Sequence, residues 1–164
     1  MMQLAGGPLI LLLLITLVTG ACSTTSQTAT QEKGVTTYNM AGTDWIFTPS
    51  AANPQSGRAR QLTGGYSVTL SGTKLVAYLP YYGEADGGAD LLSSHGPLDF
   101  TSTDFASDVH TNKGAWNITV KPRDYSEVQS MDFTFYDNGT AYLSVIMLHR
   151  SAISFTGNVA QIKS

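Results

Sequence analysis

Cysteine and basic residues are both scarce in this sequence of 164 residues, which has one cysteine, Cys22, and nine Lys and Arg against 12 Asp and Glu. A single cysteine cannot form a disulfide within the chain, so the folded part must be held together by its hydrophobic core. The formal net charge of −3 offers no basic surface for phosphates. We therefore expect no nucleic-acid partner.

The sequence also lacks the patterns of common catalytic centres. It has no nucleophile elbow for a Ser–His–Asp hydrolase, and its three histidines, His95, His110 and His149, are scattered. No second ligand accompanies any of them at the spacing that zinc sites use. We expect no cofactor, and we regard an enzyme as the less favoured interpretation.

The first residues, 1–21, carry no charged side chain, and Pro8–Val18 is an almost unbroken run of Leu and Ile. This run has the length of a signal-peptide core and is short for a membrane span. Thr19-Gly20-Ala21-Cys22 resembles the lipobox of bacterial lipoproteins, in which the cysteine is diacylated and becomes the new N-terminus. We predict a lipoprotein signal peptide over 1–21 and a lipid on Cys22. The alternative is an incidental thiol in a plain signal peptide or membrane anchor.

The segment after Cys22 is built from Ser, Thr and Gln, with almost no apolar residues before Gly34. Such a composition buries too little apolar surface to offset the entropy of ordering. We predict a flexible tether over 22–34 and one folded domain over 35–164. Val35–Tyr38 could form a first edge strand of that domain.

Two segments in the middle of the domain predict a β-hairpin. Tyr66–Leu70 alternates apolar and polar residues, and Leu75–Leu79 is a short apolar run. Ser71-Gly72-Thr73 lies between them and suits a turn. Pro80 cannot donate a ladder hydrogen bond, so it should end the second strand.

Short alternating or apolar segments recur along the rest of the chain, without a sustained helical periodicity. Asp137-Asn-Gly139 predicts a hairpin turn, Gly157 a bulge or turn between the last two strands, and Pro49–Arg60 a loop. We therefore predict an all-β fold, a single antiparallel domain built as a β-sandwich or a flattened barrel of about eight strands. The remaining strand segments are Asp44–Phe47, Leu98–Phe100 and Asp104–Asp108 beside the hairpin, Trp116–Val120, Met131–Phe135, Ala141–Leu148, Ile153–Phe155 and Val159–Ile162.

The segment that follows the hairpin is acidic and rich in glycine. Glu84, Asp86 and Asp90 carry the hard oxygen ligands that Ca²⁺ prefers, but their spacing is not that of an EF-hand. A solvated acidic loop is the favoured interpretation, with these three residues as weak metal candidates. A carboxylate pair among Glu84, Asp86 and Asp99 would suit an enzyme that acts on glycans.

Tyr81, Tyr82 and Arg150 are the candidate ligand-binding residues. Tyr rings are favoured at interfaces, although they could instead fill the core or a strand end. Arg150 follows a strongly apolar strand and could bind an anionic ligand, or a carboxylate or backbone carbonyls of the protein itself. Because neighbouring side chains alternate along an extended backbone, we expect one of the two rings to be buried beside Tyr78 or Trp116 and the other exposed.

Several of these segments together resemble a known family, domain of unknown function 4251 (DUF4251), whose members are Bacteroidetes lipoproteins. The resemblance implies a fold and a location more than a chemistry, because the family has no assigned activity. Many members have a basic residue after the first glycine, where this chain has Glu84. The matching blocks are Cys22, Leu79-Pro80-Tyr81-Tyr82-Gly83, Leu98-Asp-Phe100, Asn138-Gly-Thr-Ala141 and Arg150-Ser-Ala-Ile-Ser-Phe-Thr-Gly157.

Three functions remain open on the sequence. The one we favour is a non-enzymatic, lipid-anchored envelope protein, a binding or structural module for an unknown ligand. Its partners would be the membrane, through the lipid anchor, and an envelope protein or glycan. The alternatives are an enzyme that acts on envelope glycans or peptidoglycan through a carboxylate pair, and a small-ligand carrier with an apolar cavity.

The segment after Cys22 also bears on location. Surface-exported lipoproteins of this phylum tend to have acidic residues directly after the lipidated cysteine, whereas no acid precedes Glu32 here. We therefore predict an outer-membrane anchor with the domain facing the periplasm.

Overall fold

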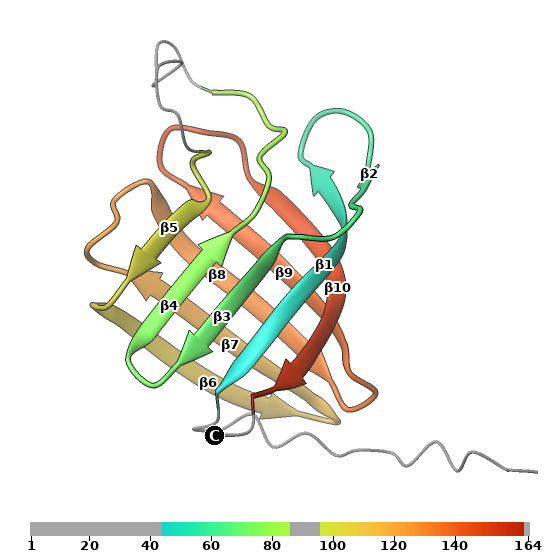
Figure 1. Ribbon diagram of the computed structural model, residues 1–164, viewed down its shortest axis with the longest axis vertical. Coiled ribbons are helices and arrows are strands. Elements are labelled where there is room, and N and C mark those ends of the chain that lie inside the picture. The colour runs from blue at the N-terminus through green and yellow to red at the C-terminus, as the bar shows by residue number, and fades with distance from the viewer. Residues whose placement is uncertain (1–43, 86–95, 163–164) are drawn as a thin grey trace, which may run out of the picture. The chain divides into compact units, whose positions relative to one another are not determined.

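Regular alternation of buried and exposed residues makes this chain a succession of β-strands. The computed structural model describes residues 44–85 and 96–162, and these ranges contain ten strands and no helix. The strands form one antiparallel sheet that is strongly bent and nearly closed into a barrel (Figure 1). The predicted all-β antiparallel domain is thus confirmed, and a barrel forms rather than two stacked sheets.

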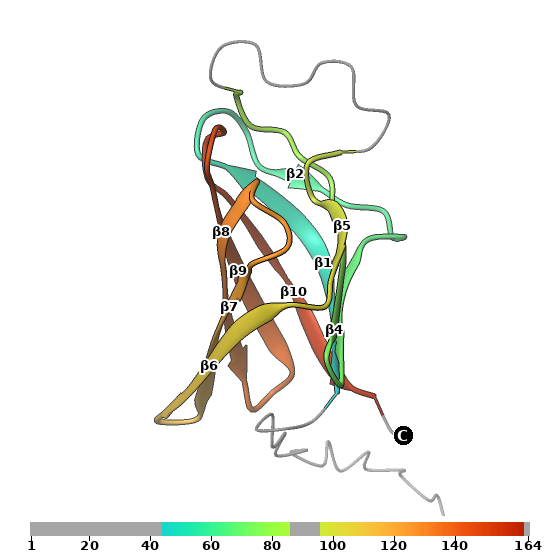
Figure 2. The ribbon, with the colours of Figure 1, turned by 90° about the vertical axis from the view of Figure 1, so that its left-hand side faces the viewer.

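The strand order across the sheet is β5-β4-β3-β1-β10-β9-β8-β7-β6, with the short β2 paired to β1. The first and last strands therefore pair in the middle, and β5 and β6 form the two edges. Figure 2 shows β6 to β9 on one side of the barrel and β1, β3, β4 and β5 on the other. The strands are β1 Trp45–Pro54, β2 Arg60–Gln61, β3 Ser67–Ser71, β4 Lys74–Tyr78, β5 Asp99–Ser102, β6 Phe105–Asn112, β7 Ala115–Pro122, β8 Val128–Tyr136, β9 Thr140–Met147 and β10 Ile153–Gln161.

Aromatic side chains fill the centre of the barrel. Trp45 and Phe47 of β1 and Phe133 and Phe135 of β8 are at most 1% exposed. The Trp45 ring lies 4.8 Å from that of Phe133 and 5.0 Å from that of Phe135, in edge-on geometry. Such a pair contributes about 0.5–1.5 kcal/mol beyond its buried area. The period-two pattern of the sequence places all four rings on the inner face.

Two hairpin turns form where glycine permits a positive φ. Gly72, with a φ of 57°, joins β3 to β4, and the Asp44 carboxylate accepts hydrogen bonds from Ser71 Oγ (2.6 Å) and Gly72 N (2.8 Å). These bonds lower the pKa of Asp44. Gly139, with a φ of 81°, joins β8 to β9 and donates its N–H to Tyr136 O at 2.9 Å. Both predicted hairpins are confirmed.

The loop predicted over Pro49–Arg60 is wrong in its first half, because β1 continues past the proline. A bulge between Pro49 and Ala51 accommodates it, and bulges are among the few places where a sheet tolerates proline. Gly157 lies opposite this bulge, and β10 runs through it without a turn. A Cβ on Gly157 would collide with Thr48 O and lie 2.7 Å from Pro49 Cα. Glycine therefore lets the two strands approach each other at the bulge.

The strand predicted over Asp104–Asp108 beside the hairpin is also misplaced. β6 begins at Phe105 and pairs with β7 over eight residues, at the opposite edge of the sheet. Of the two strands predicted beside the hairpin, only the one at Leu98–Phe100 is found there, as β5 paired with β4. The chain changes direction at Thr103 and Asp104, a turn for which the sequence carries no glycine or proline signal.

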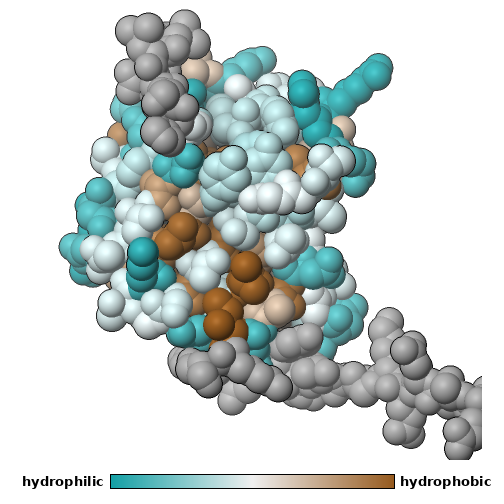
Figure 3. All heavy atoms as spheres, viewed as in Figure 1, coloured by the Kyte–Doolittle hydropathy of each residue, from teal (hydrophilic) through white to brown (hydrophobic). Residues whose placement is uncertain are grey.

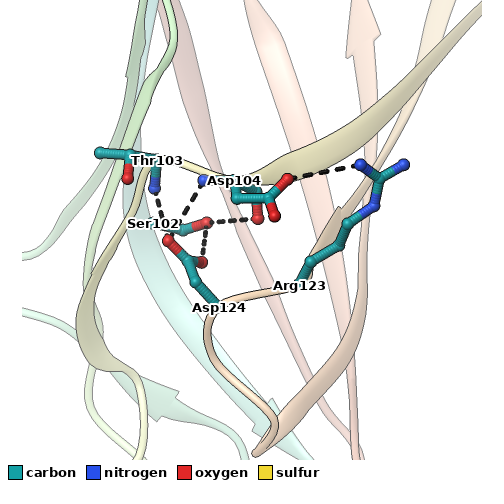
Figure 4. Close-up of polar contacts among 5 residues, drawn as sticks. All are labelled: Ser102, Thr103, Asp104, Arg123 and Asp124. Atoms are coloured by element: carbon teal, nitrogen blue, oxygen red, sulfur yellow. Dashed lines mark hydrogen bonds and ion pairs between the residues drawn. The ribbon is translucent and has the colours of Figure 1, made fainter.

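The carboxylate of Asp124 holds this corner (Figure 4). It accepts hydrogen bonds from Ser102 Oγ at 2.5 Å, from Thr103 N at 2.8 Å and from Asp104 N at 3.1 Å. These bonds, above all the one from Ser102, lower the pKa of Asp124 to about 2. Arg123 forms an exposed ion pair with Asp104 at 3.3 Å. Because Asp124 follows β7, the corner between the two edge strands is fixed to the neighbouring strand.

Several features predicted from the sequence lie outside the described residues. Residues 44–85 and 96–162 contain no helix that is long and apolar enough to cross a membrane. The predictions that lie outside these ranges are the signal peptide at 1–21, the lipid on Cys22, the tether at 22–34, the strand at Val35–Tyr38, and the metal candidates Asp86 and Asp90.

Candidate binding site at the barrel rim

Two segments that are distant in the sequence lie together at one end of the barrel. Ser151, between β9 and β10, donates its backbone N–H to Glu84 O at 3.0 Å, and Glu84 N donates to Ser151 Oγ at 2.9 Å. Ala85 and Arg150 form an isolated bridge beside them. Figure 1 shows the loops after β1, β4 and β9 at this upper end, and Figure 3 shows mostly polar residues there and apolar ones lower on the same face. We call this end the rim and define it as residues 55–62, 79–85 and 148–152.

Tyr81 locks these two segments to each other. Its hydroxyl donates to Ser151 O at 2.8 Å and also lies 3.0 Å from Glu84 O and 3.2 Å from Ser151 Oγ. Gly83 leaves the space that this arrangement needs, because a Cβ there would overlap the Tyr81 hydroxyl and lie 2.5 Å from Ser151 Oγ. Tyr81, Gly83 and Ser151 therefore form one structural unit.

Arg150 is held between this unit and a carboxylate. Its guanidinium carbon lies 5.6 Å from the centre of the Tyr81 ring, and its Nε lies 3.8 Å from Glu127 Oε2. The Arg150 side chain is only 12% exposed. Within the described ranges, neither Arg150 Nε nor Glu127 Oε2 has a hydrogen-bond partner. The structure thus brings the predicted residues Arg150 and Tyr81 together, with the charge of Arg150 balanced by Glu127.

The side-chain contacts of Tyr82 differ from those of Tyr81. The guanidinium carbon of Arg60 lies 4.5 Å from the centre of the half-buried Tyr82 ring, within the range of a cation–π contact. Arg60 is exposed, and with the described part of the chain its guanidinium forms neither a hydrogen bond nor an ion pair. A charged group is therefore oriented by an aromatic ring while its donors face solvent.

The expectation that one of Tyr81 and Tyr82 would be buried and the other exposed is wrong. Both rings are half-buried and pack against the core, and Tyr78, one of the two expected neighbours, is 48% exposed on the outside of β4. Pro80 interrupts the strand before the two tyrosines, so strict alternation does not apply to them. Their difference lies in hydrogen bonding, since Tyr81 is bound to the protein and Tyr82 carries an exposed arginine.

Tyr125 borders the rim beside Glu127. Its ring stacks on Phe100 with 4.2 Å between the ring centres, and its hydroxyl donates to Pro97 O at 2.9 Å. Burial, with the nearby carboxylate of Glu127 as a smaller cause, raises the pKa of Tyr125. These contacts attach the loop before β5 to the loop before β8.

The acidic candidates are only partly covered by the structure. Glu84 is exposed and contributes backbone atoms to the rim, whereas Asp99 lies half-buried in β5. Asp86 and Asp90 lie outside the described ranges. In those ranges no group of three or more His, Cys, Asp or Glu is placed to hold a metal ion.

Arg60 was not among the candidate binding residues identified from the sequence. It lies in a loop predicted from Pro49 onward, and its ring partner Tyr82 is 22 positions further along the chain. The pair Arg58 and Arg60 in an otherwise uncharged segment was the only available signal, and it does not point to Tyr82. A contact between side chains this far apart in the sequence leaves no periodic trace.

Comparison with known proteins gives one match. The model of the family described as "Domain of unknown function (DUF4251)" matches residues 27–159, which is most of the chain and includes every strand up to β10. No curated protein and no solved structure matches.

Proposed function

Because the chain belongs to the DUF4251 family, a domain of unknown function, we propose a function from its own residues: a non-enzymatic, lipid-anchored envelope protein that binds its ligand at the rim. The observation that carries the binding part is the exposed guanidinium of Arg60 stacked on Tyr82. A planar guanidinium that is already held against a ring loses little further conformational freedom when it binds a carboxylate through two hydrogen bonds.

The proposed ligand is peptidoglycan. Its peptides carry free carboxylates, which suit Arg60, and an anchor in the outer membrane that faces the periplasm would place the domain within reach of it. Aromatic side chains occupy the centre of the barrel among the described strands, which favours binding at the rim over binding in the interior.

The anchor itself is supported by the apolar segment that ends in Thr-Gly-Ala-Cys22. Mass spectrometry of the native protein should find a diacylglyceryl group on Cys22 as the first residue, and Cys22→Ala should release the protein from the membrane. An intact Met1 in the membrane-bound form would contradict this. Removal of the domain by protease added to intact cells would contradict the periplasmic orientation.

Co-sedimentation with purified peptidoglycan sacculi tests the binding proposal and separates it from the enzyme alternative. The native protein should pellet with sacculi in a saturable manner and release no soluble fragments. Tyr82→Ala should pellet much less, whereas Tyr136→Ala, at an exposed tyrosine at the far end of β8, should pellet like the native protein. Release of soluble muropeptides over time would instead establish an enzyme.

A further inference from the structure

The two edges of the sheet are unequal. β5 has four residues, whereas β6, at the other end of the strand order, has eight. Natural edge strands are usually protected against pairing by shortness, lysine, proline or a bulge. β6 contains neither lysine nor proline, and its register with β7 is unbroken along its whole length. Figure 2 shows β6 projecting away from the opposite side of the barrel.

The side chains of β6 are exposed as well as its edge. The six residues of Ser107–Asn112 are all exposed, including Val109, which is 39% exposed. Within the described part of the chain, β7 is the sole strand paired with β6. The outer row of backbone N–H and C=O groups on β6 is therefore available to another strand.

We propose that β6 pairs with β6 of a second copy of this chain, antiparallel and about a two-fold axis through Val109. This interface goes beyond the ligand-binding function proposed for the rim. A two-fold axis places the same residues on both sides of the interface, so the side chains of the strand must be complementary to those of an antiparallel copy of itself. The sequence of β6 meets this requirement in one register.

Charge selects that register. With Val109 opposite Val109 of the second copy, Asp108 faces His110 on both sides of the axis, which gives two pairs of opposite charge when His110 is protonated. The two side chains already meet within one strand, with Asp108 Oδ2 at 3.0 Å from His110 Nε2, and both are largely exposed. Pairs of opposite charge directly across two strands stabilise the pairing.

Neighbouring registers are worse. A shift of the axis by one residue towards either end brings Asp108 opposite Asp108, or His110 opposite His110, and like charges directly opposite are destabilising. An axis midway between two residues would pair side chains of the inner face with side chains of the outer face. The register centred on Val109 also joins the two exposed valines on one face.

The predicted dimer is weak in solution. A strand pair of this length buries less than the roughly 1,200 Å² of a typical stable interface. Two copies confined to one surface would associate more strongly, because confinement raises their effective concentration.

Disulfide trapping tests the register in the full chain carrying Cys22→Ser. Val109→Cys should give a covalent dimer under mild oxidation, because residues directly opposite have Cβ atoms about 4.5–5.5 Å apart. Ser107 is also exposed and lies on the same face of β6 as Val109, but it would be opposite Thr111, so the two thiols of Ser107→Cys would be about 13 Å apart and should not bridge. Equal trapping of both variants, or none of Val109→Cys, would overturn the proposal.

A charge exchange supplies a second test by sedimentation velocity of the full chain at high protein concentration. His110→Asp should weaken the dimer, because each Asp108 would face an aspartate. Adding Asp108→Arg to that variant should restore it, since the pairs become opposite in charge again. A monomer at every concentration, or a dimer unaffected by His110→Asp, would refute the interface.

Discussion

At Gly83 the rim has no room for a side chain. A Cβ would overlap the Tyr81 hydroxyl, which is already bound to Ser151 and Glu84, so Gly83→Ala must displace a ring or break its hydrogen bonds. We expect a loss of about 1–3 kcal/mol in the free energy of unfolding, measured by urea denaturation. Gly96→Ala is the matched control, because nothing lies within 4 Å of its added Cβ, and it should stay within about 0.5 kcal/mol. Equal small effects would mean that the interlocked segments of the rim are easily displaced.

Asp124 should make stability fall in acid. Its folded pKa of about 2 lies below its ordinary value of 3.8, so its contribution to stability is complete above about pH 4 and is lost as the pH falls towards 2. Asp124→Asn should be less stable than the native protein at pH 7, and the difference should shrink over that acidic window. Thermal unfolding at several pH values measures this. The neighbouring control Asp104→Asn, which removes only an exposed ion pair, should run parallel to the native curve.

Individual residues show how far sequence reasoning reaches. Tyr81 and Arg150 were identified as candidates separately, and the structure places them in contact. Arg60 was not identified, because its proposed role depends on a contact between β2 and Tyr82 that no local pattern encodes. The corner at Asp124 was missed for the same reason, since Ser102 and Asp124 are 22 positions apart in the sequence.

Among the elements, the strands with clear alternation were predictable and the interrupted ones were not. β7, β8 and β9 follow the period of two that a half-buried strand imposes. The prediction cut β1 short because Pro49–Arg60 is rich in Pro, Asn, Ser and Gly, and the bulge paired with Gly157 shows how the sheet accommodates Pro49. Gly157, which makes room for the bulge at Pro49, lies more than a hundred residues further along the chain. The relation is therefore visible only when β1 and β10 are seen as neighbours.

Gly157→Ala should test that relation. The added Cβ meets backbone atoms of Thr48 and Pro49, which cannot rotate away as a side chain can. We expect a loss of about 3 kcal/mol in the free energy of unfolding, at the upper end of typical overpacking. Thr156→Ala, an exposed neighbour on the same strand, should change it by less than about 0.5 kcal/mol. A Gly157→Ala protein as stable as the native one would mean that β1 and β10 can separate at the bulge without cost.

For the whole molecule, the architecture follows from the sequence more securely than the activity does. Alternating strands and hairpin turns predict an antiparallel domain, and the aromatic residues on the inner face explain why the sheet bends around a filled centre. The proposed function depends instead on a few groups at the rim. Arg60 is exposed at the rim, is oriented by the half-buried Tyr82 ring, and has no carboxylate partner among the described residues.

The most direct test of this account is a binding isotherm of the native protein on peptidoglycan sacculi, compared with those of Arg60→Ala and Arg58→Ala. Both arginines are exposed, Arg58 in the loop after β1 and Arg60 at the start of β2, and among the described residues Arg60 is the one of the two that is stacked on a ring. The account predicts that Arg60→Ala weakens binding at least about tenfold, or about 1.4 kcal/mol, while Arg58→Ala changes it by less than about twofold. Equal losses for the two variants, or native affinity in Arg60→Ala, would contradict a specific carboxylate site at the rim.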